Sequence, residues 1–223
     1  MKKSLAHLTL VFVTGISITA CTTVHEAFSG REYKLENLAR ANLGITKQDE
    51  IIQEFGSPVE INKRWFESHE AEVYFYQGQY NNYAGGNAVA NQTLACEFSK
   101  GVLTAYRLYD SAPSAQQDFD DKQRAKLVKG SSTHQDVESL LGTPSGKALL
   151  PSTITQASLG LALGGASFPL ARIPEEAKEV WQYYSETLSP GGERTARKTL
   201  SVFFDAQGLF IGGAQMQELA MGP

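Results

Sequence analysis

The sequence predicts an α+β protein made of two tandem α-α-β-β-β units, each a helix pair packed on a small antiparallel sheet. The first observation is that "GITKQDEIIQEFGSP" (44–58) recurs as "GSSTHQDVESLLGTP" (130–144), at an offset of 86 residues (130 − 44 = 86). The second is that each copy follows an amphipathic segment and precedes aromatic and β-branched runs, in the same order. A repeat of this length indicates a duplicated domain, because short solenoid repeats need several neighbours to form a core.

The recurring stretch has the pattern of a short helix with a capped start. Thr46 and Ser132 are the predicted N-cap residues, whose hydroxyls would accept a hydrogen bond from an amide of the first turn. Asp49 and Gln135 lie three residues later, where a capping box places its second side chain. Residues spaced by four share one helix face, which we expect to be buried: Ile51 and Phe55 in the first copy, Val137 and Leu141 in the second.

Both predicted helices also carry a strong stop signal. Gly56 and Gly142 stand where a helix ends in a left-handed residue, and a proline follows each of them two residues later. The segments "REYKLENLARANL" and "AQQDFDDKQRAKLVK" precede the two copies, and we expect each to form the other helix of its unit.

The runs after each copy are the predicted strands. They read "AEVYFYQG" and "LACEFSKGVLTAYRLYD" in the first half, "KEVWQYYSET" and "TLSVFFDAQGLFIGGAQM" in the second. Short extra strands near 61–66 and 147–150 would make each sheet four-stranded. Tyr74 and Tyr76 alternate with Phe75, so we expect one sheet face to pack on the helices and the opposite face to be exposed.

Residues 1–20 have the form of an export signal, with basic residues at the start, an apolar run and small residues before Cys21. The residues around Cys21 resemble the bacterial lipobox, although a plain secretory signal would also end in small residues. The apolar run is shorter than the roughly 20 residues that a membrane span needs. We therefore expect lipidation of Cys21, a lipid-anchored linker at 21–30, a first domain at 31–111 and a second at 112–223.

Composition and residue spacing exclude several function classes. A net charge of −4 with no long basic run argues against a nucleic-acid partner. Once Cys21 is lipidated, Cys96 has no intrachain partner, so we expect a small buried side chain there, or else a reactive or intermolecular thiol. His25, His69 and His134 have no partner at metal-ligand or triad spacing. The sequence therefore predicts a protein that is not an enzyme and that holds no metal or cofactor.

Two segments differ between the halves and are candidate contact surfaces. The second half contains an apolar insertion at 150–178 whose leucines, Leu161 and Leu163, could contact a protein or lipid, or could cover the domain interface. The first half has the loop "GQYNNYAGGNAVANQ", in which Tyr80 and Tyr83 have the composition of a protein-binding loop. A plain exposed hairpin is the alternative for this loop.

A third candidate surface is basic. Lys63 and Arg64 precede Trp65 and could contact anionic lipid head groups near the anchor. The alternative is a solvated pair beside a buried tryptophan.

The lipobox and the recurring "G-x-T…V/I…L/F-G-x-P" pattern together resemble the SmpA/OmlA, or BamE-like, outer-membrane lipoproteins. The matching positions in the first copy are Gly44, Thr46, Ile51, Phe55, Gly56 and Pro58, and those in the second are Gly130, Ser132, Val137, Leu141, Gly142 and Pro144. This resemblance implies an accessory role at the outer-membrane β-barrel assembly machinery, without enzymatic activity. An outer-membrane location is implied separately, by resemblance to enterobacterial sorting rules, because Thr22 and not Asp follows Cys21. The family's assembly subunit has one copy of the pattern, whereas this chain has two.

These observations predict a periplasm-facing outer-membrane lipoprotein that binds or helps to assemble envelope proteins, with barrel-assembly subunits as the implied partners. The tandem arrangement is also similar to β-lactamase inhibitor protein, in which two copies form one protein-binding surface. A periplasmic binding or inhibitor module is therefore the alternative prediction.

Overall fold

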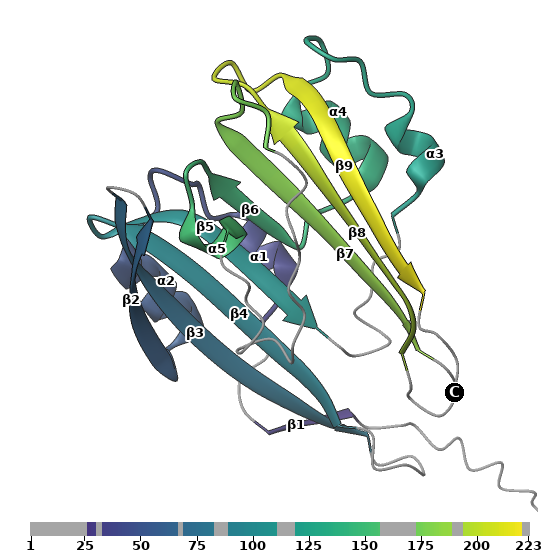
Figure 1. Cartoon of the computed structure of the whole chain (residues 1–223). Helices are drawn as coiled ribbons and strands as arrows, with labels where there is room; N and C mark the ends of the chain where they lie inside the picture. Colours follow the sequence, from purple (N-terminus) through teal and green to yellow (C-terminus); the bar gives the residue numbers. More distant parts are fainter. Residues whose placement is uncertain are drawn as a thin grey trace, which may run out of the picture.

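The computed structural model describes residues 26–29, 33–66, 69–82, 89–110, 119–156, 173–188 and 194–219 (Figure 1). Within these ranges the chain forms short helices and long strands. The helices are α1 (Leu35–Ala39), α2 (Gln48–Phe55), α3 (Asp121–Arg124), α4 (His134–Leu141) and α5 (Thr153–Gln156). The strands are β1 (Glu26–Ser29), β2 (Glu60–Phe66), β3 (His69–Asn82), β4 (Val89–Ser99), β5 (Val102–Asp110), β6 (Gly146–Leu149), β7 (Glu179–Leu188), β8 (Arg194–Phe204) and β9 (Phe210–Leu219).

These strands form one antiparallel sheet of nine strands across the described residues, in the order β1-β3-β4-β5-β6-β7-β8-β9, with β2 also paired to β3. The predicted fold class of two separate helix-and-sheet units is therefore wrong. The halves are joined because the short strand β6 pairs with β5 on one side and β7 on the other. Ala105, Tyr106 and Arg107 lie opposite Ala148, Lys147 and Gly146 at this junction.

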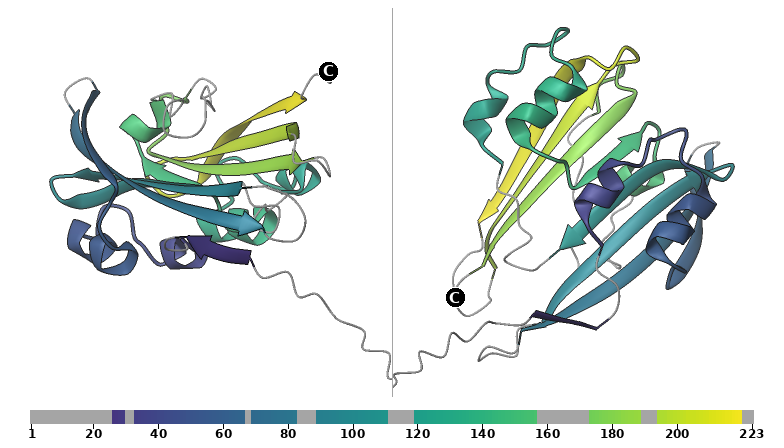
Figure 2. Two further views of the ribbon diagram at one scale, coloured as in Figure 1. Left: turned by 90° about the horizontal axis from the view of Figure 1, so that it is seen from below. Right: turned by 180° about the vertical axis from the view of Figure 1, so that it is seen from behind.

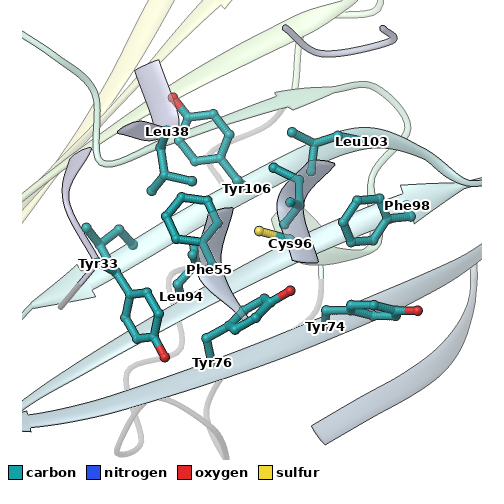
Figure 3. Close-up of a cluster of buried hydrophobic side chains, with 12 residues drawn as sticks. Tyr33, Leu38, Phe55, Tyr74, Tyr76, Leu94, Cys96, Phe98, Leu103 and Tyr106 are labelled. Atoms are coloured by element: carbon teal, nitrogen blue, oxygen red, sulfur yellow. The ribbon is translucent and has the colours of Figure 1, made fainter. Parts of the chain in front are cut away.

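Four of the described helices cover one face of the sheet, as the two views of Figure 2 show. The side chains of α1 and α2 pack on β3, β4 and β5, where the Phe55 ring packs against Tyr76 and Leu38 belongs to the same buried cluster (Figure 3). A second cluster places Val137 and Leu141 of α4 against β7, β8 and β9. We call this side of the sheet the helix face. Both clusters lie on it, because one row of paired residues crosses the sheet: Cys96, Tyr106, Lys147, Trp181 and Val202.

The opposite side, which we call the α5 face, is also buried at its centre. Phe75, which alternates with Tyr74 and Tyr76 of the helix face, is only 1% exposed there. It belongs to a cluster that runs from Val73 of β3 to Ile211 of β9 and includes Ile154 of α5. The expectation of an exposed second face fails because this cluster and α5 close that face. One core shared by both halves is a second reason why the sheet is continuous.

The recurring helices start one residue later than predicted. The N-caps are Lys47 and Thr133, and only Thr133 caps through its side chain. Its hydroxyl accepts from the Asp136 N–H at 3.3 Å, while its own N–H donates to Asp136 Oδ2 at 2.8 Å. In the first copy the Lys47 N–H donates to Glu50 Oε1 at 3.1 Å.

The predicted cap hydroxyls instead close the turn before each helix. Thr46 Oγ1 accepts from the Asn42 N–H, and Ser132 Oγ accepts from the Val128 N–H, both at 2.9 Å. The predicted stops are confirmed, because both helices end at a glycine with positive φ, 81° at Gly56 and 80° at Gly142.

The two halves repeat their strand pairing residue for residue. Glu60 of β2 lies opposite Phe75 of β3, and Gly146 of β6 lies opposite Gln182 of β7, which are the matching positions of the second half. The predicted extra strands near 61–66 and 147–150 are therefore present as β2 and β6. Where the first domain ends stays a prediction, because residues 111–118 lie outside the described ranges.

Candidate functional site

Several predicted site residues lie outside the described ranges: Cys21, Tyr83, Leu161 and Leu163. Tyr80 is described, and it lies within β3 and not in a loop. Its backbone is paired on both sides, opposite Phe28 of β1 and Ala90 of β4. Of the insertion at 150–178, residues 150–156 and 173–178 are described, and they contribute α5 and Ala177 to the core of the α5 face.

The two basic residues proposed for lipid contact are not brought together. They are consecutive in β2, so their side chains point to opposite faces of the sheet. Lys63 Nζ lies 3.8 Å from Glu72 Oε1 on the helix face. The Arg64 guanidinium lies 5.7 Å from the centre of the Phe75 ring, on the α5 face.

The same strand supplies the most unusual surface of the described molecule. Among the described strands β2 pairs only with β3, so no described strand pairs with its other edge, although α5 also contacts β2. Two exposed apolar side chains lie at this strand, Ile61 within it at 52% and Val59 directly before it at 62% exposure, and Ile52 of the preceding helix α2 is 36% exposed. The chain enters β2 directly after the stop of α2, because the Val59 N–H donates to the Phe75 carbonyl oxygen at 2.8 Å. We call Ile52, Val59, Ile61 and the free side of β2 the β2 edge.

The matching positions of the second half have the opposite character. Glu138, Ser145 and Lys147 stand where the first half has Ile52, Val59 and Ile61. Yet the edge of β6 is covered by β5. The apolar residues therefore lie beside the strand whose edge is open, and the polar residues beside the strand whose edge is paired. A monomer protected from unwanted association would show the reverse.

A polar and aromatic cluster lies on the helix face of the second half. His134 Nε2 is 3.1 Å from Glu179 Oε2, and the His134 ring stacks on Trp181 with centroids 5.0 Å apart. Trp181 Nε1 donates to Glu179 Oε1 at 2.5 Å, and Lys147 Nζ lies 4.0 Å from the centre of a Trp181 ring. Burial alone would raise the pKa of Glu179. The hydrogen bonds from His134 and Trp181, with the charges of His134 and Lys147, outweigh it and hold that pKa below its ordinary value.

The first half builds the same constellation from different residues. Gln48, Glu72 and Tyr74 stand at the positions of His134, Glu179 and Trp181. The Gln48 amide donates to the Tyr74 hydroxyl and, at 3.3 Å, to Glu72 Oε2. Because the arrangement occurs in both halves and joins each capped helix to its sheet, we interpret it as structural. No group of three or more potential metal ligands occurs within the described ranges.

Glu97 is the one fully buried carboxyl group of the described residues, at 0% exposure on the α5 face. Its Oε2 accepts from the N–H groups of Thr153 and Ile154 at 2.6 and 2.9 Å, and from the hydroxyls of Ser152 and Thr153 at 3.1 and 2.6 Å. Its Oε1 accepts from the Thr104 hydroxyl at 3.1 Å. A carboxyl group of the first half thus caps α5, which begins the insertion of the second half.

Two further observations concern Cys96 and the possibility of a membrane-spanning helix. Cys96 is a buried free thiol, and burial raises its pKa, so it fits the predicted small core side chain. None of the described helices is long and apolar enough to cross a membrane. Sequence reasoning missed the β2 edge and Glu97. A signal existed for both, since the apolar residues of the first copy have polar counterparts in the second, and "LACEF" places a charge on an otherwise buried strand.

Comparisons with known proteins add little to this picture. No family model matches the sequence, and no curated protein matches it. Among solved structures, the chain is similar to one described as "putative beta-lactamase inhibitor protein" from Streptococcus mutans, with a TM-score of 0.42 and 16% identity, covering 77% of this chain and 82% of that one. A likeness this distant carries no conclusion about fold or function. The resemblance to the SmpA/OmlA lipoproteins stays a prediction from the sequence motifs.

Proposed function

We propose that this chain is a non-catalytic lipoprotein of the outer membrane that binds other envelope proteins through the β2 edge. The observation that carries the proposal is the exposure of Ile52, Val59 and Ile61 beside an open sheet edge. Exposed apolar side chains that gather beside unpaired strand backbone are a typical protein-binding surface.

The anchor part of the proposal rests on the sequence. Lipidation of Cys21 would hold the chain at the membrane, because each buried methylene of an acyl chain contributes about 0.8 kcal/mol. Barrel-assembly subunits are the partners that the sequence resemblance implies. The alternative, an inhibitor directed at one soluble enzyme, would use the same surface.

Photo-crosslinking in living cells tests the proposal. A photoreactive residue replaces Ile61 in the full-length lipoprotein, and the same residue replaces Val128, an equally exposed side chain of the second half (59% exposed), as the control. We expect adducts with defined envelope proteins from position 61 and none of these from position 128. The same adducts from both positions, or none from either, would show that the β2 edge is not a binding surface.

Mass spectrometry of the trapped partners separates the two candidate roles. Adducts with barrel-assembly subunits or nascent barrels, together with lowered porin levels on deletion of the gene, would support the assembly role. Adducts with a single soluble enzyme and unchanged porin levels would support the inhibitor role.

A further inference from the structure

The molecule contains its own example of how a strand like β2 is covered. Strands β2 and β6 are equivalent, because each follows a capped helix that ends in Gly-x-Pro and each holds the same register against the next strand. Their outer edges differ in one respect. The edge of β6 is paired antiparallel with β5, and the edge of β2 is unpaired within the described ranges.

The pairing of β5 with β6 shows which side chains a strand places opposite this edge when it covers it. Arg107 of β5 lies opposite Gly146, Tyr106 opposite Lys147, and Ala105 opposite Ala148. The positions in β2 that match Gly146, Lys147 and Ala148 are occupied by Glu60, Ile61 and Asn62.

The residues of β2 complement a strand of that kind better than those of β6 do. A basic side chain in the place of Arg107 would face the carboxylate of Glu60, which is exposed. An aromatic side chain in the place of Tyr106 would face Ile61, and aromatic with β-branched is a favourable cross-strand pair. Glu60 carries a Cβ where Gly146 has none, so the added strand would lie at the ordinary spacing of about 4.8 Å.

We propose that β2 is extended by one antiparallel strand from a partner protein, an extended segment in which an aromatic residue opposite Ile61 is followed by a basic residue opposite Glu60. This inference rests on the proposed protein-binding function and specifies how the partner is held. Main-chain hydrogen bonds to the open edge supply affinity, and the two side-chain pairs supply register and specificity. Ile52 and Val59 extend the apolar contact on the helix face.

A second copy of this chain is a poorer occupant. Besides β1 and β2, in which no aromatic residue is followed by a basic one, the edge strand of the described sheet is β9, whose residues at the positions of Ala105, Tyr106 and Arg107 are Gly212, Gly213 and Ala214. This sequence offers neither the aromatic nor the basic side chain. Head-to-tail pairing of β9 with the β2 of another copy would therefore form the backbone ladder without either side-chain pair.

The test uses the full-length lipoprotein in detergent and a fluorescent peptide with the β5 sequence "VLTAYRLYD", which carries the aromatic and basic residues in the required order. Fluorescence anisotropy should show saturable binding, weakened at least about fivefold by Ile61→Lys. Val128→Lys is the matched control and should bind as the wild type does.

A charge exchange tests the register. Glu60→Arg should weaken binding of the original peptide, and a peptide with Glu in place of its Arg should restore it. Binding unaffected by Ile61→Lys, or no restoration by the exchanged pair, would overturn the strand-addition proposal. So would a dimer of the lipoprotein, measured by light scattering, that Ile61→Lys dissociates, because the occupant would then be a second copy.

The outcome separates this inference from the function on which it rests. If crosslinks from position 61 form in cells but the peptide does not bind, protein binding stands and strand addition fails. If neither forms, both fail.

Discussion

The strands β2 and β6 hold the same place in the two halves, and they differ in what covers them. β6 is a four-residue strand between two neighbours and carries Lys147, whose ammonium group lies over Trp181. β2 is a seven-residue strand with one neighbour in the described structure, and it exposes Ile61 at the position of that lysine. The charged side chain of Lys147 lies in a strand that is paired on both sides. The apolar side chain of Ile61 is exposed in a strand that is paired on one side only. In the described sheet, exposed apolar side chains therefore mark the strand edge with which no other described strand pairs.

The largest expected effect concerns Glu97, a buried carboxylate of the first half. Phe203 stands at the matching position of the second half, so the second half has no such group. Glu97→Ala removes the acceptor for the donors at residues 152–154 and leaves them buried. We expect the free energy of unfolding in urea to fall by about 3 kcal/mol. Thr104→Val removes the one hydroxyl that donates to Oε1 and to the Glu97 carbonyl oxygen, leaves the donors at residues 152–154 in place, and should cost about 1 kcal/mol. Equal effects of the two variants would contradict the assignment of Glu97 as the cap of α5.

The pairing of β5 with β6 can be disrupted by placing the β2 residue Glu60 at the matching position of β6, Gly146. A Cβ at Gly146 would lie 2.8 Å from the Tyr106 carbonyl oxygen, so Gly146→Glu should force β5 and β6 apart. We expect a loss of about 2 kcal/mol of unfolding free energy. The reciprocal change, Glu60→Gly, should cost less than about 1 kcal/mol because no described strand pairs with that edge. A larger loss from Glu60→Gly than from Gly146→Glu would show that the β2 edge is not open in solution.

Glu179 makes the stability of the second half depend on pH. The pKa of Glu179 in the folded chain is below its ordinary value of 4.5. Its contribution to stability is therefore present above pH 4.5 and is lost as the pH falls through the folded pKa. Glu179→Gln should reduce the difference in unfolding free energy between pH 7 and pH 3 by about 1 kcal/mol. A pH dependence that Glu179→Gln leaves unchanged would contradict the stabilising contribution of the Glu179 carboxylate.

The smallest effect on stability is expected from the variant with the largest effect on binding. Ile61→Lys places the β6 residue in β2, at a position that is 52% exposed. The free energy of unfolding should change by less than about 0.5 kcal/mol, because Ile61 is not part of a core cluster. Thermal unfolding of the variant beside the wild type measures this. A loss above about 1 kcal/mol would show that Ile61 serves the fold and not a partner.

Local elements could be predicted from the sequence, and their assembly could not. The helix stops at Gly56 and Gly142 follow from backbone chemistry that a glycine reveals by itself. The caps were displaced by one residue. In the second copy Ser132 and Thr133 both carry a hydroxyl near the helix start, and only geometry shows which hydrogen bond each makes. In the first copy the cap position falls on Lys47, which has no hydroxyl. The expected amphipathic helices at 31–43 and 115–129 shortened to α1 and α3, of five and four residues.

The single sheet was missed for a physical reason. Pairing of β5 with β6 involves three residue pairs, and a four-residue strand carries too little periodicity to reveal its neighbours. The repeat itself favoured two separate units, since it gave each half its own helices and strands. Of the candidate site, the strand β2 and its basic residues were predicted. Its significance depends on which strand has a neighbour, and that is a property of the assembled sheet.

The cap that Glu97 places on α5 also has a kinetic consequence. The hydrogen-bonded groups at Glu97 and Thr153 are 56 residues apart in the chain, so closing this contact costs several kcal/mol of chain entropy before it is repaid. The hairpin of β4 and β5 needs only a two-residue turn at Lys100 and Gly101. The hairpin therefore forms early, with the Glu97 side chain still hydrated. Arrival of residues 152–154 is the step that removes that water, and it comes later in folding than the hairpin because it closes a much longer loop.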